Sequence, residues 1–204
     1  MKAGATNAVA AGDLILHRIV SERKRSMDAL TSDNMAHETI GILRFKILGQ
    51  DMCIILKHVV KVLPLMELQI VPDAPGYVKG LMNLQGNSVP VIDLAERLGA
   101  ARASISYTID TPILLCEVMN KRIGLIVDEI LGVVAVEKGD LQMQSEFQQS
   151  QRYFMAVVNQ GGMSALLVNL ERIADKGFLQ KNADMPVIVE FQNNQLFTAT
   201  RTGK

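Results

Sequence analysis

The sequence contains no tryptophan, and aromatic residues of any kind make up only 4% of it. Proteins that bind single-stranded nucleic acids stack the bases on aromatic side chains, so this scarcity argues against that class. The 21 basic and 21 acidic side chains give a formal net charge of zero at pH 7. Binding to a nucleic acid backbone usually uses a net basic field or a basic stripe, and the chain has neither. We therefore expect no nucleic acid among its partners.

Cysteines and long apolar runs are scarce as well. The two cysteines, Cys53 and Cys116, each stand inside an apolar run, where a thiol acts as a small buried hydrophobe and suits a reducing compartment. No run approaches the roughly 20 apolar residues that span a bilayer. The N-terminal region has no continuous apolar stretch, because Asn7, Gly12 and Asp13 interrupt it, and this argues against a signal peptide. The sequence predicts a cytoplasmic protein without direct membrane insertion.

The residue groups that carry catalysis or hold cofactors are also missing. His17, His37 and His58 have no Cys, Asp or Glu beside them at metal-ligand spacing. Gly80 and Gly86 form neither of the glycine patterns that hold phosphate groups, and no local nucleophile motif is present. We therefore expect no metal, no cofactor and no enzymatic activity, which favours a binding module.

What the sequence does contain is a repeated β pattern. Residues 41–65 hold two apolar, β-branched runs joined by a turn at LGQD, and residues 110–136 repeat this pattern around MNKR at a spacing of 71 positions. A second pair of stretches, 77–94 and 153–170, aligns at a spacing of 76 positions. The repetition predicts two similar small β units, each stabilised by packing on the other.

The stretch 77–94 also carries predicted turns and a helix cap. Gly80 stands within an apolar run, which predicts a bulge or the close approach of another backbone. Gly86 and Asn87 tolerate positive φ at low cost, so together they predict a hairpin turn. Asp93 follows an apolar run and has Glu96 three residues later, a capping-box spacing that predicts a short helix beginning at Asp93.

The chain divides into a central region and two tails. We expect an N-terminal extension over residues 1–38, with a short amphipathic helix within 13–30. Residues 39–177 form the central β domain, and residues 178–204 form a C-terminal extension.

The stretch GYVKGLMNLQGNSVPVIDLAERLG resembles the CheW family of bacterial chemotaxis adaptors, and the resemblance continues through RIGLIVDEILGVVAV. It implies a mainly β fold of two SH3-like five-stranded β-barrel subdomains packed together, with short helices. It also implies a non-catalytic adaptor in signal transduction, which couples the cytoplasmic tip of a chemoreceptor (a methyl-accepting chemotaxis protein) to the regulatory domain of the histidine kinase CheA. Such a protein would be cytoplasmic and recruited to membrane-bound receptor arrays.

The resemblance further implies a receptor groove between the barrels, in which the absent side chain of Gly80 would let a receptor helix approach. Two positions depart from the family pattern. Gln85 stands where the family usually has Arg, and Lys61 stands where it usually has Glu, so the groove would be more positive. This predicts a non-standard receptor or a second pathway, such as pilus-based motility. The implied receptor-binding residues are Val59, Lys61, Val62, Gly80, Gln85, Gly124 and Val133.

Overall fold

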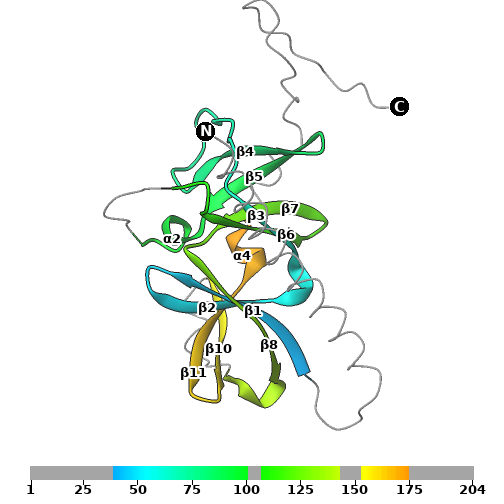
Figure 1. The fold of residues 1–204 in the computed structure, drawn as a ribbon, viewed down its shortest axis with the longest axis vertical. Coiled ribbons are helices and arrows are strands. Elements are labelled where there is room, and N and C mark those ends of the chain that lie inside the picture. Colours follow the sequence, from blue (N-terminus) through cyan, green and yellow to red (C-terminus); the bar gives the residue numbers. More distant parts are fainter. Residues whose placement is uncertain (1–38, 101–106, 143–152, 175–204) are drawn as a thin grey trace, which may run out of the picture.

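The computed structural model describes residues 39–100, 107–142 and 153–174, which form short helices and two β-sheets (Figure 1). The predicted helix within 13–30 and both tails, 1–38 and 178–204, lie outside the described residues. The first half of the chain contains β1 (Thr39–Ile47), β2 (Gln50–Ile55), the 3-10 helix η1 (Leu56–His58), β3 (Val59–Pro64), β4 (Val78–Leu84), β5 (Asn87–Asp93) and α2 (Leu94–Arg97). The second half contains β6 (Pro112–Val118), β7 (Lys121–Ile126), β8 (Glu129–Glu137), η2 (Lys138–Asp140), β9 (Leu141–Gln142), β10 (Phe154–Gln160), β11 (Met163–Val168) and α4 (Leu170–Ile173).

The two predicted hairpins form as the sequence indicates. In the first, Ile47 pairs with Gln50, and the turn residues Leu48 and Gly49 have φ angles of 49° and 77°. The β6–β7 turn has the same form, with two residues at positive φ. Two-residue turns of this kind match the right-handed twist of the flanking strands, so they set the register of each hairpin.

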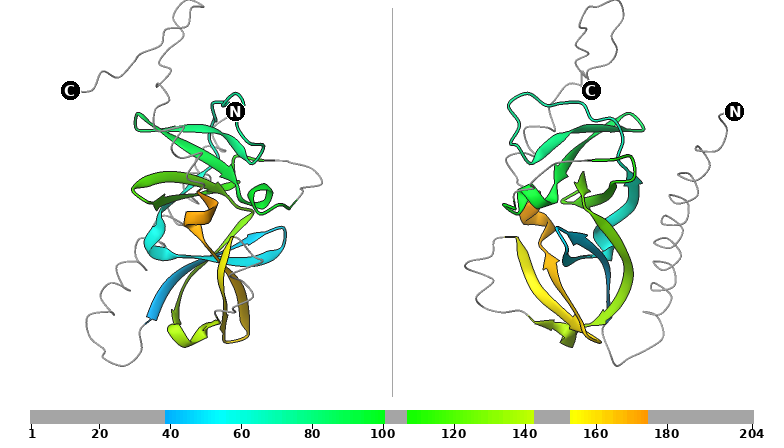
Figure 2. Two further views of the ribbon diagram at one scale, coloured as in Figure 1. Left: turned by 180° about the vertical axis from the view of Figure 1, so that it is seen from behind. Right: turned by 60° about the vertical axis from the view of Figure 1, so that its left-hand side comes forward.

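The strands assemble into two packed sheets. Sheet A has the order β8-β1-β2-β11-β10-β9, and sheet B has the order β3-β6-β7-β5-β4. Figures 1 and 2 show sheet A as the lower layer and sheet B as the upper one, with α4 near their junction. The mainly β architecture is the predicted one, and the two-residue strand β9 adds a sixth strand to sheet A.

Each sheet combines strands from both halves of the chain. Sheet A takes β1 and β2 from the first half and its remaining strands from the second, whereas sheet B takes β6 and β7 from the second half and its remaining strands from the first. The repeat predicted from sequence is therefore present, and each sheet is shared between the two halves of the chain. The short η1 passes the chain from sheet A to sheet B, so the repeats are interleaved.

Within the part of the chain that the structure describes, three hydrophobic cores hold this arrangement together. One lies within sheet A and includes Ile42 and Val136, and another lies within sheet B and includes Met82 and Ile113. The largest contains buried side chains of both sheets together with those of α2 and α4, including Phe45. Burial of apolar surface is the dominant favourable term in folding, so the shared core ties the two sheets into one structure.

Both cysteines are buried, as predicted. Cys53 belongs to the core of sheet A, and Cys116 belongs to the shared core. Burial raises the pKa of each thiol to about 12, because the thiolate would lose its hydration. Both thiols are therefore protonated at neutral pH and behave as apolar side chains.

Candidate functional site

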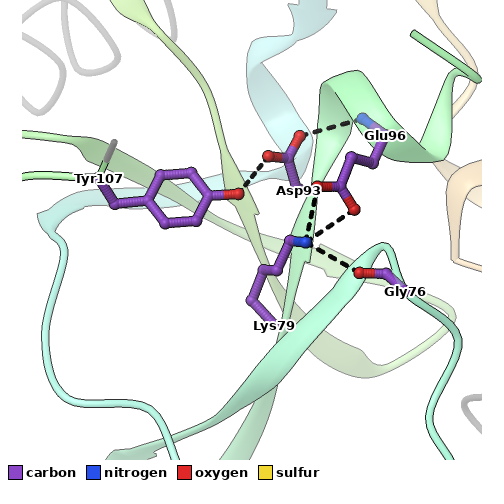
Figure 3. Close-up of polar contacts among 5 residues, drawn as sticks. All are labelled: Gly76, Lys79, Asp93, Glu96 and Tyr107. Atoms are coloured by element: carbon purple, nitrogen blue, oxygen red, sulfur yellow. Dashed lines mark hydrogen bonds and ion pairs between the residues drawn. The ribbon is translucent and has the colours of Figure 1, made fainter. Parts of the chain in front are cut away.

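Asp93 caps the short helix α2, as the sequence predicts (Figure 3). Its Oδ1 accepts the backbone N–H of Glu96 at 3.1 Å, and its Oδ2 accepts the Tyr107 hydroxyl. The carboxyl group is fully buried, so these donors replace the water that it loses. The role of Asp93 is structural.

Glu96 does not complete the capping box that its spacing suggested. The backbone N–H of Asp93 donates instead to the carbonyl oxygen of Tyr77 at 2.8 Å. Both carboxylate oxygens of Glu96 accept from Lys79 Nζ at 2.7 Å, and Lys79 also donates to the Gly76 carbonyl (Figure 3). This ion pair connects β4 to α2 at the edge of sheet B.

The β4–β5 turn lies one residue earlier than predicted. Its two positive-φ residues are Gln85 and Gly86, at 54° and 81°, while Asn87 already begins β5. The Asn83 side chain accepts the Gly86 N–H at 2.9 Å, which fixes the turn from the strand before it. The predicted pair Gly86–Asn87 was wrong because the polar side chain of Asn83 places the turn one step upstream.

Three of the residues that the resemblance assigns to the receptor groove lie in the shared core. Val59, Val62 and Val133 are only 1%, 3% and 6% exposed. Val59 and Val62 come from β3 of sheet B, and Val133 comes from β8 of sheet A. They pack in the core between the two sheets, and their contact with a partner stays a prediction.

Gly80 faces its own chain. A Cβ there would lie 2.5 Å from the carbonyl oxygen of Gln69. The backbones of Gln69 and Leu81 exchange two hydrogen bonds, each N–H donating to the other residue's carbonyl oxygen. The pairing of β4 also shifts register between Val78 and Gly80, so both the predicted bulge and the predicted close approach of a backbone are confirmed. The absent side chain leaves room for the backbone of Gln69, and the approach of a receptor helix to Gly80 stays a prediction.

Gly124 is likewise surrounded by its own chain. A Cβ there would lie 2.9 Å from Ile113 Cγ2 and 3.2 Å from Val91 Cγ2, inside the core of sheet B. The glycine therefore lets neighbouring strands pack closely. A contact between Gly124 and a partner stays a prediction.

Of the seven implied receptor-binding residues, Lys61 and Gln85 have side chains that reach the surface. Lys61 is half-buried on β3, and Gln85 is exposed in the β4–β5 turn. Among the residues that the structure describes, no hydrogen bond or ion pair joins them, and the strands β3 and β4 form opposite edges of sheet B.

The sequence reasoning missed Arg97, which lies where the two repeats meet. Its guanidinium carbon lies 4.5 Å from the ring centroid of Tyr77 and 4.9 Å from that of Tyr153, two residues that align in the repeat. It also donates to the Tyr153 hydroxyl at 2.9 Å and to the Ile173 carbonyl at 3.0 Å. Arg97 thus joins α2 to the C-terminal end of α4, where the last carbonyls of a helix need donors.

An open surface pocket of about 470 Å³ lies where η1 and β3 meet the β6–β7 turn. Two of its lining side chains are exposed and apolar, Val60 at 41% and Met119 at 43%. Glu171 of α4 adds a carboxylate to the same lining. The remaining lining residues are Lys57, His58, Val59, Glu117, Val118 and Asn120.

Groups that could hold a metal ion do not occur within residues 39–100, 107–142 and 153–174. In the same residues, no helix has the length and apolar character needed to cross a membrane. The exposed apolar side chains of the pocket suit contact with another protein.

Comparison with known proteins gives a consistent family. A sequence profile described as "CheW-like domain" matches residues 41–177. "Chemotaxis protein CheW" of Rhizobium meliloti (strain 1021) is 27% identical over 136 residues, covering 65% of this chain and 85% of that protein. The protein of the same name from Treponema pallidum (strain Nichols) is 27% identical over 133 residues, covering 63% and 76%. The crystal structure of the scaffolding protein TtCheW from Thermoanaerobacter tengcongensis superposes with a TM-score of 0.62 at 20% identity, covering 69% of this chain and 96% of that one. This chain belongs to the CheW-like domain family.

Proposed function

We propose that this protein is a non-catalytic adaptor that couples the cytoplasmic tip of a chemoreceptor to the regulatory domain of the histidine kinase CheA. The observation that carries the proposal is the family match over residues 41–177, because it spans strands of both sheets. The relatives are named chemotaxis proteins, and the superposed structure is a scaffolding protein. The adaptor would be recruited to membrane-bound receptor arrays through its receptor contact.

The surface chemistry supports a receptor contact near Lys61 and Gln85. Both side chains reach the surface from sheet B, whose strand β3 also places Val59 and Val62 in the rigid shared core. A rigid element holds a binding residue in place at a low entropic cost. The receptor contact would then be supported by the five buried positions of the set, Val59, Val62, Gly80, Gly124 and Val133.

The charge of this surface favours an alternative to the main chemotaxis pathway. Lys61 and Gln85 replace the Glu and Arg that are usual in the family, so a receptor suited to this surface would carry a complementary negative or polar side chain. We propose as the second candidate a scaffold of another chemosensory pathway, such as pilus-based motility.

A pull-down of the full chain against the kinase regulatory domain and a receptor tip, each offered separately, tests the adaptor role. We expect the chain to retain both partners. Loss of the positive charge in Lys61→Glu should reduce retention of the protein's own receptor, while kinase retention stays unchanged. Lys138→Glu, at an exposed position of η2 between the strands β8 and β9 of sheet A, is the matched charge control.

Two outcomes would contradict these proposals. Retention of neither partner by the folded chain would overturn the adaptor role. The double variant Lys61→Glu, Gln85→Arg restores the family pattern, so it should bind a standard chemotaxis receptor better than the unchanged chain does. If the unchanged chain already binds and activates a standard receptor–kinase complex fully, the second-pathway candidate is wrong.

A further inference from the structure

The strand β8 has an edge that no other strand covers within the described residues. It ends sheet A and pairs with β1 alone. On its other edge, the Gln160 side chain donates to the Ala135 carbonyl oxygen at 3.2 Å. A sheet edge is a ready template for association, and proteins usually cover such an edge or carry charges on it. The nine residues of β8 therefore form a surface that another segment can cover.

The surface along β8 is apolar in its middle and acidic at both ends. Its half-buried apolar side chains are those of Ile130, Leu131 and Val134. Ala135 is exposed, and by strand alternation its side chain lies on the same face as that of Val133. The strand begins with Glu129, ends with Glu137 and contains no basic residue. A segment with apolar and basic side chains would complement this edge.

The β8 edge adjoins the proposed receptor contact. Val133, one of the implied receptor-binding residues, belongs to β8 itself. Val62 of β3 is its equivalent in the repeat, and both valines lie in the shared core. A segment bound along β8 would therefore compete with a receptor for the same part of the molecule.

The chain itself enters the described structure beside this edge. Thr39, the first residue of β1, pairs with Glu137, the last residue of β8, and Figure 1 shows the blue start of β1 next to β8. The preceding residues 31–38 can span at most about 26–29 Å. They hold the segment 13–30 within reach of an edge that is itself about 30 Å long.

The sequence of the segment 13–30 complements the β8 edge. Apolar residues recur there at helical spacing, namely Leu16, Ile19, Val20, Met27 and Leu30. The segment also carries the basic residues Arg18, Arg23, Lys24 and Arg25 close together. A helix over 13–30 would be about 27 Å long, which matches the length of β8. The C-terminal extension 178–204 has no comparable basic cluster, so the N-terminal segment fits the acidic edge better.

We infer that the segment 13–30 binds along the β8 edge of its own chain and blocks the receptor contact until a receptor displaces it. The apolar stripe of the segment packs on the middle of the strand, and its basic residues face the glutamates at the ends. The binding of the segment is a property of the chain alone, whereas the block rests on the proposed adaptor function.

A tryptophan reporter in the full chain tests the binding of the segment. The natural sequence contains no tryptophan, so Ile19→Trp supplies a single fluorophore. We expect its emission to be that of a buried indole and to shift to the red when Ala135→Lys is added, because the new ammonium group repels the basic segment. Ser164→Lys, at an exposed position of β11 in the same sheet, is the matched control and should leave the emission unchanged. Circular dichroism verifies that each variant is folded.

Amide hydrogen exchange gives a second measurement without the reporter. Residues 13–30 of the unchanged chain should exchange more slowly than the same residues of the Ala135→Lys variant. Solvent-exposed emission of Ile19→Trp overturns the inference, and so do emission and exchange that Ala135→Lys leaves unchanged. Emission that depends on protein concentration also overturns it, because the segment would then bind a second copy.

The receptor tip tests the block. Its addition should shift the emission of Ile19→Trp to the red, and Ile19→Asp with Val20→Asp should raise the apparent receptor affinity about threefold or more, because more of the chain is then open. A receptor tip that binds without moving the segment overturns the block and leaves the adaptor role intact. A receptor tip that binds neither the unchanged chain nor this open variant overturns the adaptor role, while the fluorescence still decides where the segment lies.

Discussion

Gln85 occupies in the β4–β5 turn the left-handed position that Gly161 occupies in the β10–β11 turn. The two residues align in the repeat, and their φ angles are 54° and 56°. Glycine adopts this conformation freely, whereas a side chain makes it cost about 1–2 kcal/mol. The β4–β5 turn therefore carries backbone strain that its counterpart avoids.

Gln85→Gly should raise the free energy of unfolding by about 0.5–1 kcal/mol, because relief of the strain exceeds the entropy that glycine adds to the unfolded chain. Urea unfolding measures the change, and receptor retention measured on the same variant separates the two roles of this residue. Higher stability with weaker retention would mean that the side chain serves binding. Lower stability would contradict the assignment of strain.

Gly80→Ala should destabilise the fold by about 2 kcal/mol or more. The new methyl group would meet the Gln69 carbonyl oxygen at 2.5 Å, and the backbone φ of 147° is itself unfavourable for a side chain. Ala156 aligns with Gly80 in the repeat and serves as a matched reference, since Ala156→Gly should cost only about 0.5–1 kcal/mol. Equal effects of the two variants on urea unfolding would refute the predicted clash.

Arg97→Met should lower the unfolding free energy by about 2 kcal/mol, because it removes charge-assisted hydrogen bonds and the contacts with two aromatic rings. Arg97→Lys should recover only part of this loss, since an ammonium group cannot donate to Tyr153 and Ile173 in the same planar geometry. Tyr153→Phe removes the hydroxyl and so tests the hydrogen bond between Arg97 and Tyr153 alone. If Arg97→Met unfolds at the same urea concentration as the unchanged chain, Arg97 does not join the two helices.

Alkaline pH should weaken the fold through its two thiols. In the unfolded chain a thiol ionises near its ordinary pKa of 9.0, whereas burial holds the folded pKa of Cys53 and Cys116 at about 12. The folded state then binds more protons than the unfolded state between these values, so stability is full below pH 9.0 and falls as pH rises toward 12. Urea unfolding at pH 8 and 10 should show the loss, and Cys53→Ala with Cys116→Ala should flatten the slope. A slope that persists in the double variant would assign it to other groups.

Two fragments divided within residues 101–106 should fold only together. Each sheet needs strands from both fragments, so either fragment alone lacks partners for its strands and for the shared core. Circular dichroism of each fragment should show little β structure, and mixing should restore it. A fragment that folds cooperatively by itself would contradict the interleaved arrangement.

The sequence predicted the local features of the fold well. Apolar β-branched runs indicate strands, and the Asp93 cap follows from one side chain and the helix beside it. The β4–β5 turn was misplaced by one residue because Asn83 decides it through a side-chain bond. The sequence pattern did not predict that each sheet combines strands of both repeats. The alternation of apolar and polar side chains shows which face of a strand is buried, but it does not show which strand lies beside it.

The candidate site was harder to predict than the fold. A glycine such as Gly80 marks a close approach, but the sequence does not say whether the approaching chain is its own. Arg97 was missed because its partners lie 56 and 76 residues away. The alignment of Tyr77 with Tyr153 was one signal that could have indicated it. Two equivalent aromatic rings suggest a place where the two repeats meet, and Arg97 contacts both rings.

The interleaved strands give the molecule the form of a dimer made within one chain. A half-length ancestor with this pairing would have exchanged strands with a second copy, and its folding would have depended on its concentration. The connection between β5 and β6 replaces that encounter by an intramolecular one, at an effective concentration independent of dilution. It also lets the two halves differ in sequence, as Lys57 and Asp128 do with opposite charges at the spacing of 71 positions.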